Sequence, residues 1–298
     1  MKKLIIVISC ILGLIMLSNT VFKSKGNEEI RIIDGKNLNR GTCPIEVLEE
    51  KSSLGKIFSK GKTVFGIKIF ATEGVSDDKF NHAVNIMAEY LDNNEDGIAD
   101  NKSVVKKMIE LDATMVLFKN EEEENQIMSN NEMIFNSLKN EDSLQNLYDE
   151  EINIDGSKFG QFDASYEEIL HLITHVGYAN VYPKTLGEIQ GTKIANAMDV
   201  ARGGTFIKVP ESYPATAWYS YYDETADYGT MITEYVYWAL TSILGAQNFD
   251  GRYEEIKEEW KLNTLEKVKD KDTRIYNILT DEKYKFPKIL PDGKYEIN

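Results

Sequence analysis

Two of the three histidines in this chain, His171 and His175, lie four residues apart within the stretch Asp163–Tyr178. Ser165 has the character of a helix N-cap, and the apolar residues after it fall at helical spacing. With 3.6 residues per turn, both imidazoles lie on one face of the expected helix. Such a pair is half of a common site for a divalent transition metal. The sequence therefore predicts that His171 and His175 bind a metal; two polar residues on a partly buried helix are the structural alternative.

Glu168 lies one turn before His171 on the same side of this helix. A carboxylate in that place is a candidate catalytic general base beside a bound metal. The spacing from Ser165 to Glu168 also matches a capping box, in which the glutamate only satisfies the N-cap amide. The sequence leaves both roles open.

A third ligand is expected from the segment Thr230–Gly245, which is apolar on nearly every side. A helix of this kind is buried. Glu234 lies in its middle, and a buried carboxylate costs free energy unless it is paired or binds a metal. Glu234 is thus the predicted third metal ligand, with a hydrogen-bonded structural glutamate as the alternative.

Two helical histidines four residues apart, with a glutamate on a later helix, resemble the zincin metallopeptidases of the Glu-ligand type. The resemblance implies zinc held by His171, His175 and Glu234. Zinc with an open coordination position lowers the pKa of bound water to about 7 and polarises a carbonyl group. A peptide or another extracellular substrate is the implied partner.

The zincin motif has a glutamate directly after its first histidine, and Leu172 occupies that position here. The base would then be Glu168 or Glu167, one turn earlier, or it would be missing. A tyrosine near the third ligand, Tyr235 or Tyr228, is the expected catalytic group that stabilises an oxyanion.

A possible calcium loop follows the predicted helix Asp77–Leu91. Its first, third, fifth and ninth positions carry oxygen ligands, and a glycine stands at the sixth, as in the first part of an EF-hand loop; the four residues are Asp92, Asn94, Asp96 and Asp100. Ser103 replaces the bidentate glutamate of the twelfth position, which weakens the expected affinity. An ordinary Asn/Asp/Gly turn that caps the next helix is the alternative.

Residues 1–25 have a basic start, an apolar run and a polar end, as in a secretory signal. The apolar run is shorter than the ~20 residues of a membrane-spanning helix, so residues 1–25 are a signal peptide or, if uncleaved, an N-terminal anchor. Residues 26–45 are expected to form a polar tether, with a short strand at 30–33, and 46–298 a single domain. We expect a protein that is secreted or held at the cell surface, with no other contact to the membrane.

The net charge of −15 argues against nucleic-acid binding, which requires lysine and arginine against phosphates. Only Cys43 remains after the signal segment, so no internal disulfide is expected.

The expected fold is α+β, mainly helical, with a small sheet and the metal helix in the core. Strands are predicted at 63–71 and 114–118, helices at 45–58, 77–91, 104–111 and 194–201, short helices within 125–150, and helical pieces at 256–262, 265–268 and 275–279. His82 lies off the apolar face of its helix and is expected at the surface.

Three functions are compatible with these features. The first is an exported zinc-dependent hydrolase, most directly a peptidase. The second is a catalytically inactive zincin-like protein, and the third is a calcium-stabilised binding protein of the cell surface.

Overall fold

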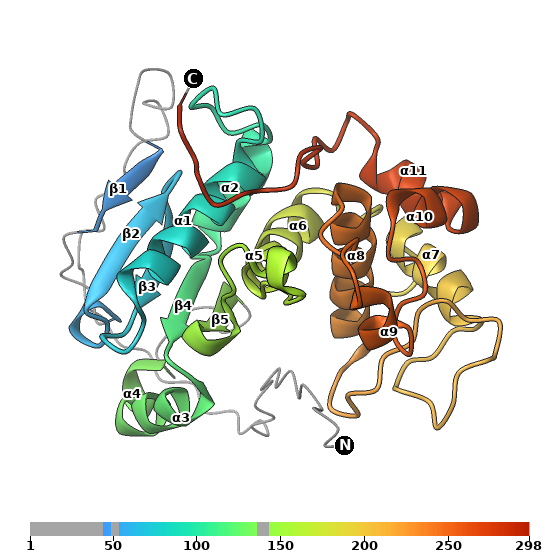
Figure 1. The fold of residues 1–298 in the computed structure, drawn as a ribbon, viewed down its shortest axis with the longest axis horizontal. Helices are drawn as coiled ribbons and strands as arrows, with labels where there is room; N and C mark the ends of the chain where they lie inside the picture. The colour runs from blue at the N-terminus through green and yellow to red at the C-terminus, as the bar shows by residue number, and fades with distance from the viewer. Residues whose placement is uncertain (1–43, 49–53, 136–142, 298) are drawn as a thin grey trace, which may run out of the picture.

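The computed structural model describes residues 44–48, 54–135 and 143–297 (Figure 1). A five-stranded mixed sheet has the order β1-β2-β3-β4-β5. Its strands are β1 (Ile45–Val47), β2 (Lys60–Val64), β3 (Ile67–Ala71), β4 (Thr114–Phe118) and β5 (Leu144–Tyr148). The first three are antiparallel neighbours, and the last three run parallel. The α+β class with a small sheet is confirmed; the predicted signal segment and strand 30–33 lie outside the described residues.

The single strand predicted at 63–71 is wrong, because the chain turns back inside it. Val64 pairs with Ile67, and the two residues between them, Phe65 and Gly66, both have positive φ. A two-residue hairpin turn with positive φ at both positions matches the twist of its strands and favours glycine. The β-branched and aromatic residues on both sides of Gly66 favoured one continuous strand in the sequence analysis.

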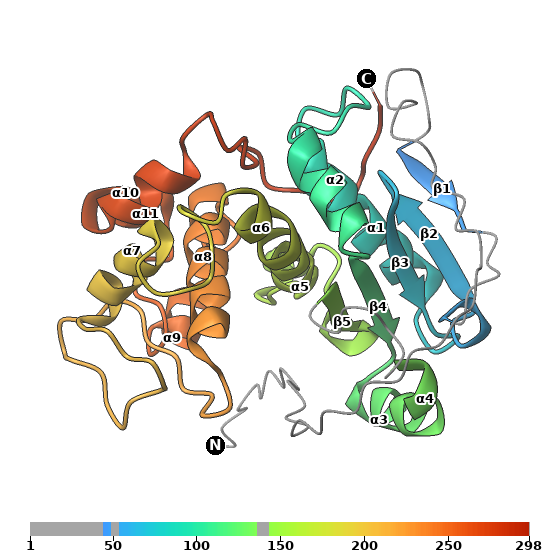
Figure 2. The same cartoon turned by 180° about the vertical axis from the view of Figure 1, so that it is seen from behind.

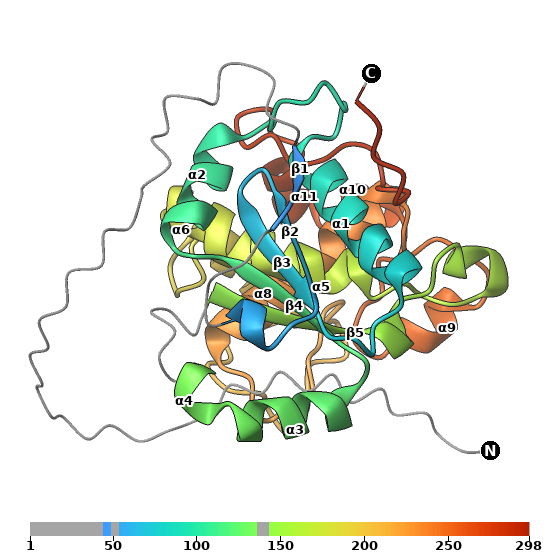
Figure 3. The same ribbon diagram turned by 90° about the vertical axis from the view of Figure 1, so that its left-hand side faces the viewer.

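The two faces of the sheet belong to two hydrophobic clusters, because side chains alternate along a strand. One face joins the large core through Ile67, Ile69, Met115 and Leu117. The other face packs with α3 and α4 through Phe70, Val116 and Phe118. Figure 3 shows α3 and α4 together below the sheet, away from α1 and α2.

Helices make up most of the remaining described chain. In order they are α1 (Asp77–Leu91), α2 (Lys102–Glu110), α3 (Glu121–Asn130), α4 (Glu132–Phe135), α5 (Ser165–Leu172), α6 (Ala179–Val181), α7 (Lys193–Arg202), α8 (Tyr228–Leu244), α9 (Arg252–Ile256), α10 (Leu265–Lys271) and α11 (Thr273–Leu279). None of the helices in the described part of the chain is long and apolar enough to cross a membrane.

Several sequence predictions of these elements are confirmed, and others are wrong. The helix predicted at 77–91 has those ends, and α8 is buried along most of its length as expected. The described parts of 45–58 do not form the predicted helix: 44–48 contain β1, and 54–58 contain a single 3-10 turn at Leu54–Lys56. Within 125–150 the structure adds strand β5 to the expected short helices.

Helix α5 lies between the sheet and α8, and both views along the short axis show this order (Figures 1 and 2). It contacts β5 and α1 on one side and α8 on the other. Helix α8 in turn packs against α7, α10 and α11. The helix predicted to bind the metal is therefore in the core, where side chains from both halves of the molecule can reach it.

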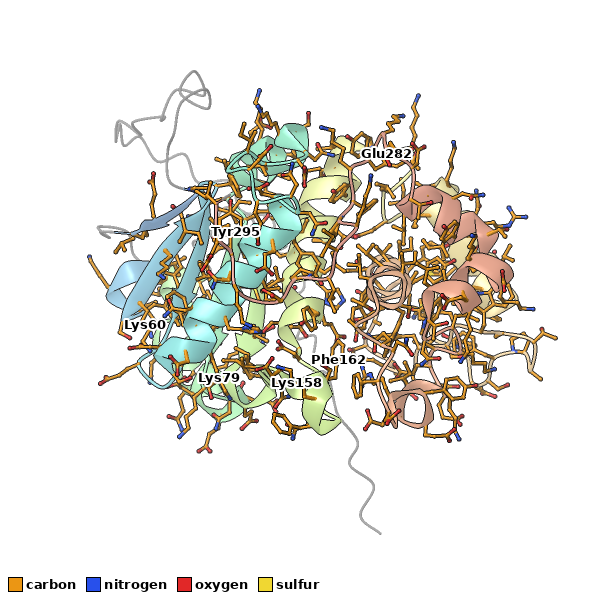
Figure 4. All side chains as sticks on the ribbon, turned by 45° about the horizontal axis from the view of Figure 1, so that its top comes forward. Lys60, Lys79, Lys158, Phe162, Glu282 and Tyr295 are labelled. Carbon is orange, nitrogen blue, oxygen red and sulfur yellow. The ribbon has the colours of Figure 1, made fainter. Side chains whose placement is uncertain are left out.

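The C-terminal segment crosses α1, and Figure 4 marks Tyr295 beside that helix. The amides of Gly293 and Lys294 donate to the Glu89 carboxylate at 3.0 and 2.7 Å. The Tyr295 hydroxyl donates to Asp92 at 2.6 Å. These bonds attach the end of the chain to the first long helix.

Candidate metal centre

The metal helix begins differently from the prediction. Ser165 does not cap it: the N-cap is Ala164, and the backbone amide of Ser165 donates to the Asp163 carboxylate at 3.0 Å. The other oxygen of Asp163 bonds Nε2 of His82 at 2.6 Å. His82 is buried, so its predicted surface position is wrong. Glu168 accepts from Gln145 on β5 at 2.6 Å, which is not the contact of a capping box.

The helix continues from α5 through a π-helical segment, Ile173–Tyr178, into α6. π-turns within α-helices are rare and are frequent at functional sites. Gly177 lies in this segment, where a Cβ atom would come within 2.6 Å of Val104 on α2. The glycine therefore allows α2 to lie close against the metal helix.

Three buried side chains from α5 and α8 come together: Glu167, His171 and Glu234. One ligand atom from each lies within 4.8 Å of the others. His171 Nε2 and Glu234 Oε2 are 3.7 Å apart, too far for a hydrogen bond. Two ligand atoms of a tetrahedral zinc ion are separated by about 3.3 Å, given bond lengths near 2.0 Å. The spacing of these atoms therefore fits a metal ion among them.

Two atoms of this triad have no hydrogen-bond partner within the part of the chain that the structure describes. They are Nε2 of His171 and Oε1 of Glu167. A buried polar atom without a partner costs free energy, so each such atom needs an explanation. A cation bound by both atoms would satisfy them.

The pKa values of the triad depart from their ordinary range. Burial raises the pKa of Glu167 well above its usual value, and the carboxylates of Glu234 and Glu168 raise it further. Burial also raises the pKa of Glu234 to about 7, although His171 opposes this. For His171, burial disfavours the charged form, but Glu234 and Glu168 outweigh it and raise the pKa to about 10. In the absence of a metal, these raised pKa values mean that the triad binds protons, which offset the negative charge of its carboxylates as a metal ion would.

Glu168 lies next to the triad, against the imidazole of His171. Its carboxylate lies 3.5 Å from Nδ1 of His171 and is fixed by Gln145. A carboxylate that accepts from one imidazole nitrogen turns the other nitrogen toward a metal and raises its basicity. On the other ligand, the Tyr221 hydroxyl donates to Glu234 Oε1 at 3.4 Å.

We expect Glu168→Ala to lower the zinc affinity by about 10–100-fold, because such supporting carboxylates contribute that much in known sites. Competition against a chromogenic chelator measures the affinity. Glu150→Ala removes an exposed carboxylate near the same strand and is the matched control. Equal affinities of the two variants would contradict the supporting role.

The structure places the other predicted residues away from this triad. Nδ1 of His175 contacts the Glu188 carboxylate, and the His175 side chain is partly exposed. The hydroxyl of Tyr235 donates to Asp272 at 2.6 Å, and that of Tyr228 donates to Asp199 at 3.0 Å. Of the three predicted zinc ligands, the structure brings His171 and Glu234 together and adds Glu167.

The predicted calcium loop uses its side chains to bind its own backbone. Asp92 accepts from the amides of Asp96 and Gly97, and Asp100 accepts from the amide of Asn93. Asp96 accepts from Asn94 at 3.3 Å. Within the described residues, Asp92, Asp96 and Asp100 do not form a close group of three acidic ligands like that of the triad. Calcium binding at this loop stays a prediction.

The sequence analysis named Glu167 only as a candidate base and not as a member of the triad, although a signal for that position exists. Glu167 and His171 have the same four-residue spacing as His171 and His175. The spacing therefore allows two ligand pairs that share His171, one with Glu167 and one with His175. Which pair lies next to Glu234 depends on where α8 packs against the helix.

Comparisons with known proteins give no relative. The chain matches no family model, and neither the curated proteins nor the solved structures contain a significant match to it. The site is thus interpreted from its own residues.

Proposed function

We propose that this protein is an exported metal-dependent hydrolase, with zinc as the metal and peptide bonds as its substrate class. The observation that carries the proposal is the pair of buried atoms without a hydrogen-bond partner in the described residues, His171 Nε2 and Glu167 Oε1, beside the Glu234 carboxylate. One imidazole and two carboxylates suit a divalent cation, and the two negative charges balance it in a buried site.

The order of the residues supports a hydrolase. The peptidase motif H-E-x-x-H has a ligand, then a catalytic glutamate, then a second ligand at the fifth position. Glu167-Glu168-Ile-Leu-His171 has the same order, with Glu167 in place of the first histidine. If the two ligands on this helix are Glu167 and His171 instead of His171 and His175, the residue after the first ligand is Glu168. The position that Leu172 occupied in the first alignment is then filled by a glutamate, as in the peptidase motif.

Each residue then has a role in hydrolysis. Glu167, His171 and Glu234 would hold the metal, which when bound lowers the pKa of water and polarises a carbonyl oxygen. Glu168 follows the first ligand and would accept the proton of the attacking water. Gln145 fixes the Glu168 carboxylate at 2.6 Å and so keeps it beside the triad.

The proposed location is outside the cell, either secreted or held at the surface by the N-terminal segment. The basic and then apolar pattern of residues 1–25 supports this. A net charge of −15 is compatible with an extracellular domain that folds around a large core.

A second function, a non-catalytic binding protein stabilised by its metal, is favoured by one observation. All four side chains at the centre, Glu167, Glu168, His171 and Glu234, are buried. A hydrolase must admit its substrate to the metal, whereas a structural ion needs no such access.

Hydrolysis by the zinc-loaded protein separates the two functions. We expect the wild type to cleave a quenched-fluorescent peptide library and to lose this activity when the metal is removed. With zinc in excess, Glu168→Gln should lower kcat by about 10²–10⁴-fold, since it removes the general base. If the zinc-loaded wild type cleaves no peptide, the hydrolase proposal is contradicted and the non-catalytic, metal-stabilised binding protein remains.

A further inference from the structure

The side chains along the metal helix change from buried to exposed at His175. The side chain of His171 is 4% exposed, whereas that of His175, one turn later, is 43% exposed. Glu167, one turn before His171, is buried like the rest of the triad. Of the residues at four-residue spacing on this helix, Glu167 and His171 are buried and His175 is accessible to solvent.

Glu188 connects His175 to the helix that carries the third ligand. One oxygen of its carboxylate contacts Nδ1 of His175, and the other accepts from the Thr233 hydroxyl at 2.8 Å. Thr233 directly precedes Glu234 on α8. The His175–Glu188–Thr233 group thus bridges the same two helices as the triad and lies on its solvent side.

A buried metal site needs a path by which the ion enters. An imidazole beside a carboxylate is a chemically suitable first stop for a divalent cation, because both are metal ligands. The carboxylate also attracts the cation: a charged, low-dielectric environment raises association rates by about 10–10³-fold. The step from His175 to His171 spans one helical turn, about 5–6 Å.

We propose that His175 and Glu188, here named the loading pair, bind the divalent cation transiently and pass it to Glu167, His171 and Glu234. This inference rests on the proposed function only in that the triad is the final metal site. The π-helical segment contains His175, and this places the loading pair on the part of the helix that departs from α-helical hydrogen bonding. The role is kinetic: the pair shortens the time that loading takes and leaves the final affinity unchanged.

Zinc uptake by the apo full-length protein tests the loading pair. The probe is Zn²⁺ alone, supplied from a chromogenic chelator, with the rate followed by stopped-flow absorbance. We expect His175→Ala and Glu188→Gln each to slow uptake by about tenfold or more and to leave the equilibrium affinity at the wild-type value. Release to EDTA must then slow by the same factor, because the equilibrium constant is the ratio of the two rates.

Glu122→Gln is the matched control, since it removes one exposed carboxylate on α3 and should change neither rate. Unchanged uptake in both loading-pair variants would overturn the inference and leave the metal site intact. A fall in equilibrium affinity with unchanged uptake would also overturn it, because His175 would then act as a ligand or a support. Absence of zinc binding by the wild type would refute the proposed metal site itself, and the loading pair with it.

Discussion

His171→Ala is expected to abolish stoichiometric zinc binding, with a loss of affinity of more than about 100-fold. Removal of a supporting residue costs 10–100-fold in known sites, and loss of the ligand itself should cost more. His171 is the only imidazole of the triad, and its Nε2 is one of the two atoms that need a partner. Metal analysis of the protein dialysed against a known free zinc concentration measures the result.

His175→Ala is the matched control for this prediction, because it removes the same side chain from the same helix one turn later. It should retain one zinc ion per chain. The opposite outcome, with zinc lost from His175→Ala and kept by His171→Ala, would favour the ligand pair that helical spacing alone suggested.

Zinc is expected to stabilise the protein much more at pH 8.5 than at pH 5.5. The folded-state pKa of Glu234 is raised from 4.5 to about 7, and that of His171 from 6.5 to about 10. A raised pKa adds stability below the unfolded-state value, and this stability is lost as the pH rises through the folded-state value. The metal-free protein should therefore lose stability from pH ~4.5 to ~7 through Glu234, and from ~6.5 to ~10 through His171.

Zinc binds the deprotonated groups, so it displaces protons and binds more tightly at higher pH. At a zinc concentration 100 times Kd, the free energy of unfolding rises by about 2.7 kcal/mol. For a domain of this size that corresponds to a Tm increase of about 5–10 °C. Thermal unfolding with zinc or with EDTA at both pH values measures the difference. An equal Tm shift at the two pH values would contradict proton displacement from the triad.

The sequence predicted those elements whose pattern is local. The spacing of apolar residues predicted α1 with its observed ends, and the short, mainly apolar run at 114–118 predicted β4. It did not give β5, because Leu144-Gln-Asn-Leu-Tyr148 mixes polar and apolar residues at the edge of the sheet. The hairpin at Phe65-Gly66 was also missed, since a non-glycine residue with positive φ has no simple sequence signal.

Only those site residues that depend on local sequence properties could be predicted. His171 and Glu234 follow from residue type and helical burial, which are local properties. Glu167 depends on how α8 lies against α5, and Glu188 reaches His175 from a turn thirteen residues later in the chain. Neither contact can be read from spacing within one helix.

The attachment of Gly293 and Lys294 to α1 also makes this helix depend on residues far along the chain. Glu89 is synthesised some two hundred positions before Gly293 and Lys294, whose amides are its hydrogen-bond donors. Until those residues pack against α1, the Glu89 carboxylate depends on water, and α1 is uncovered along that side.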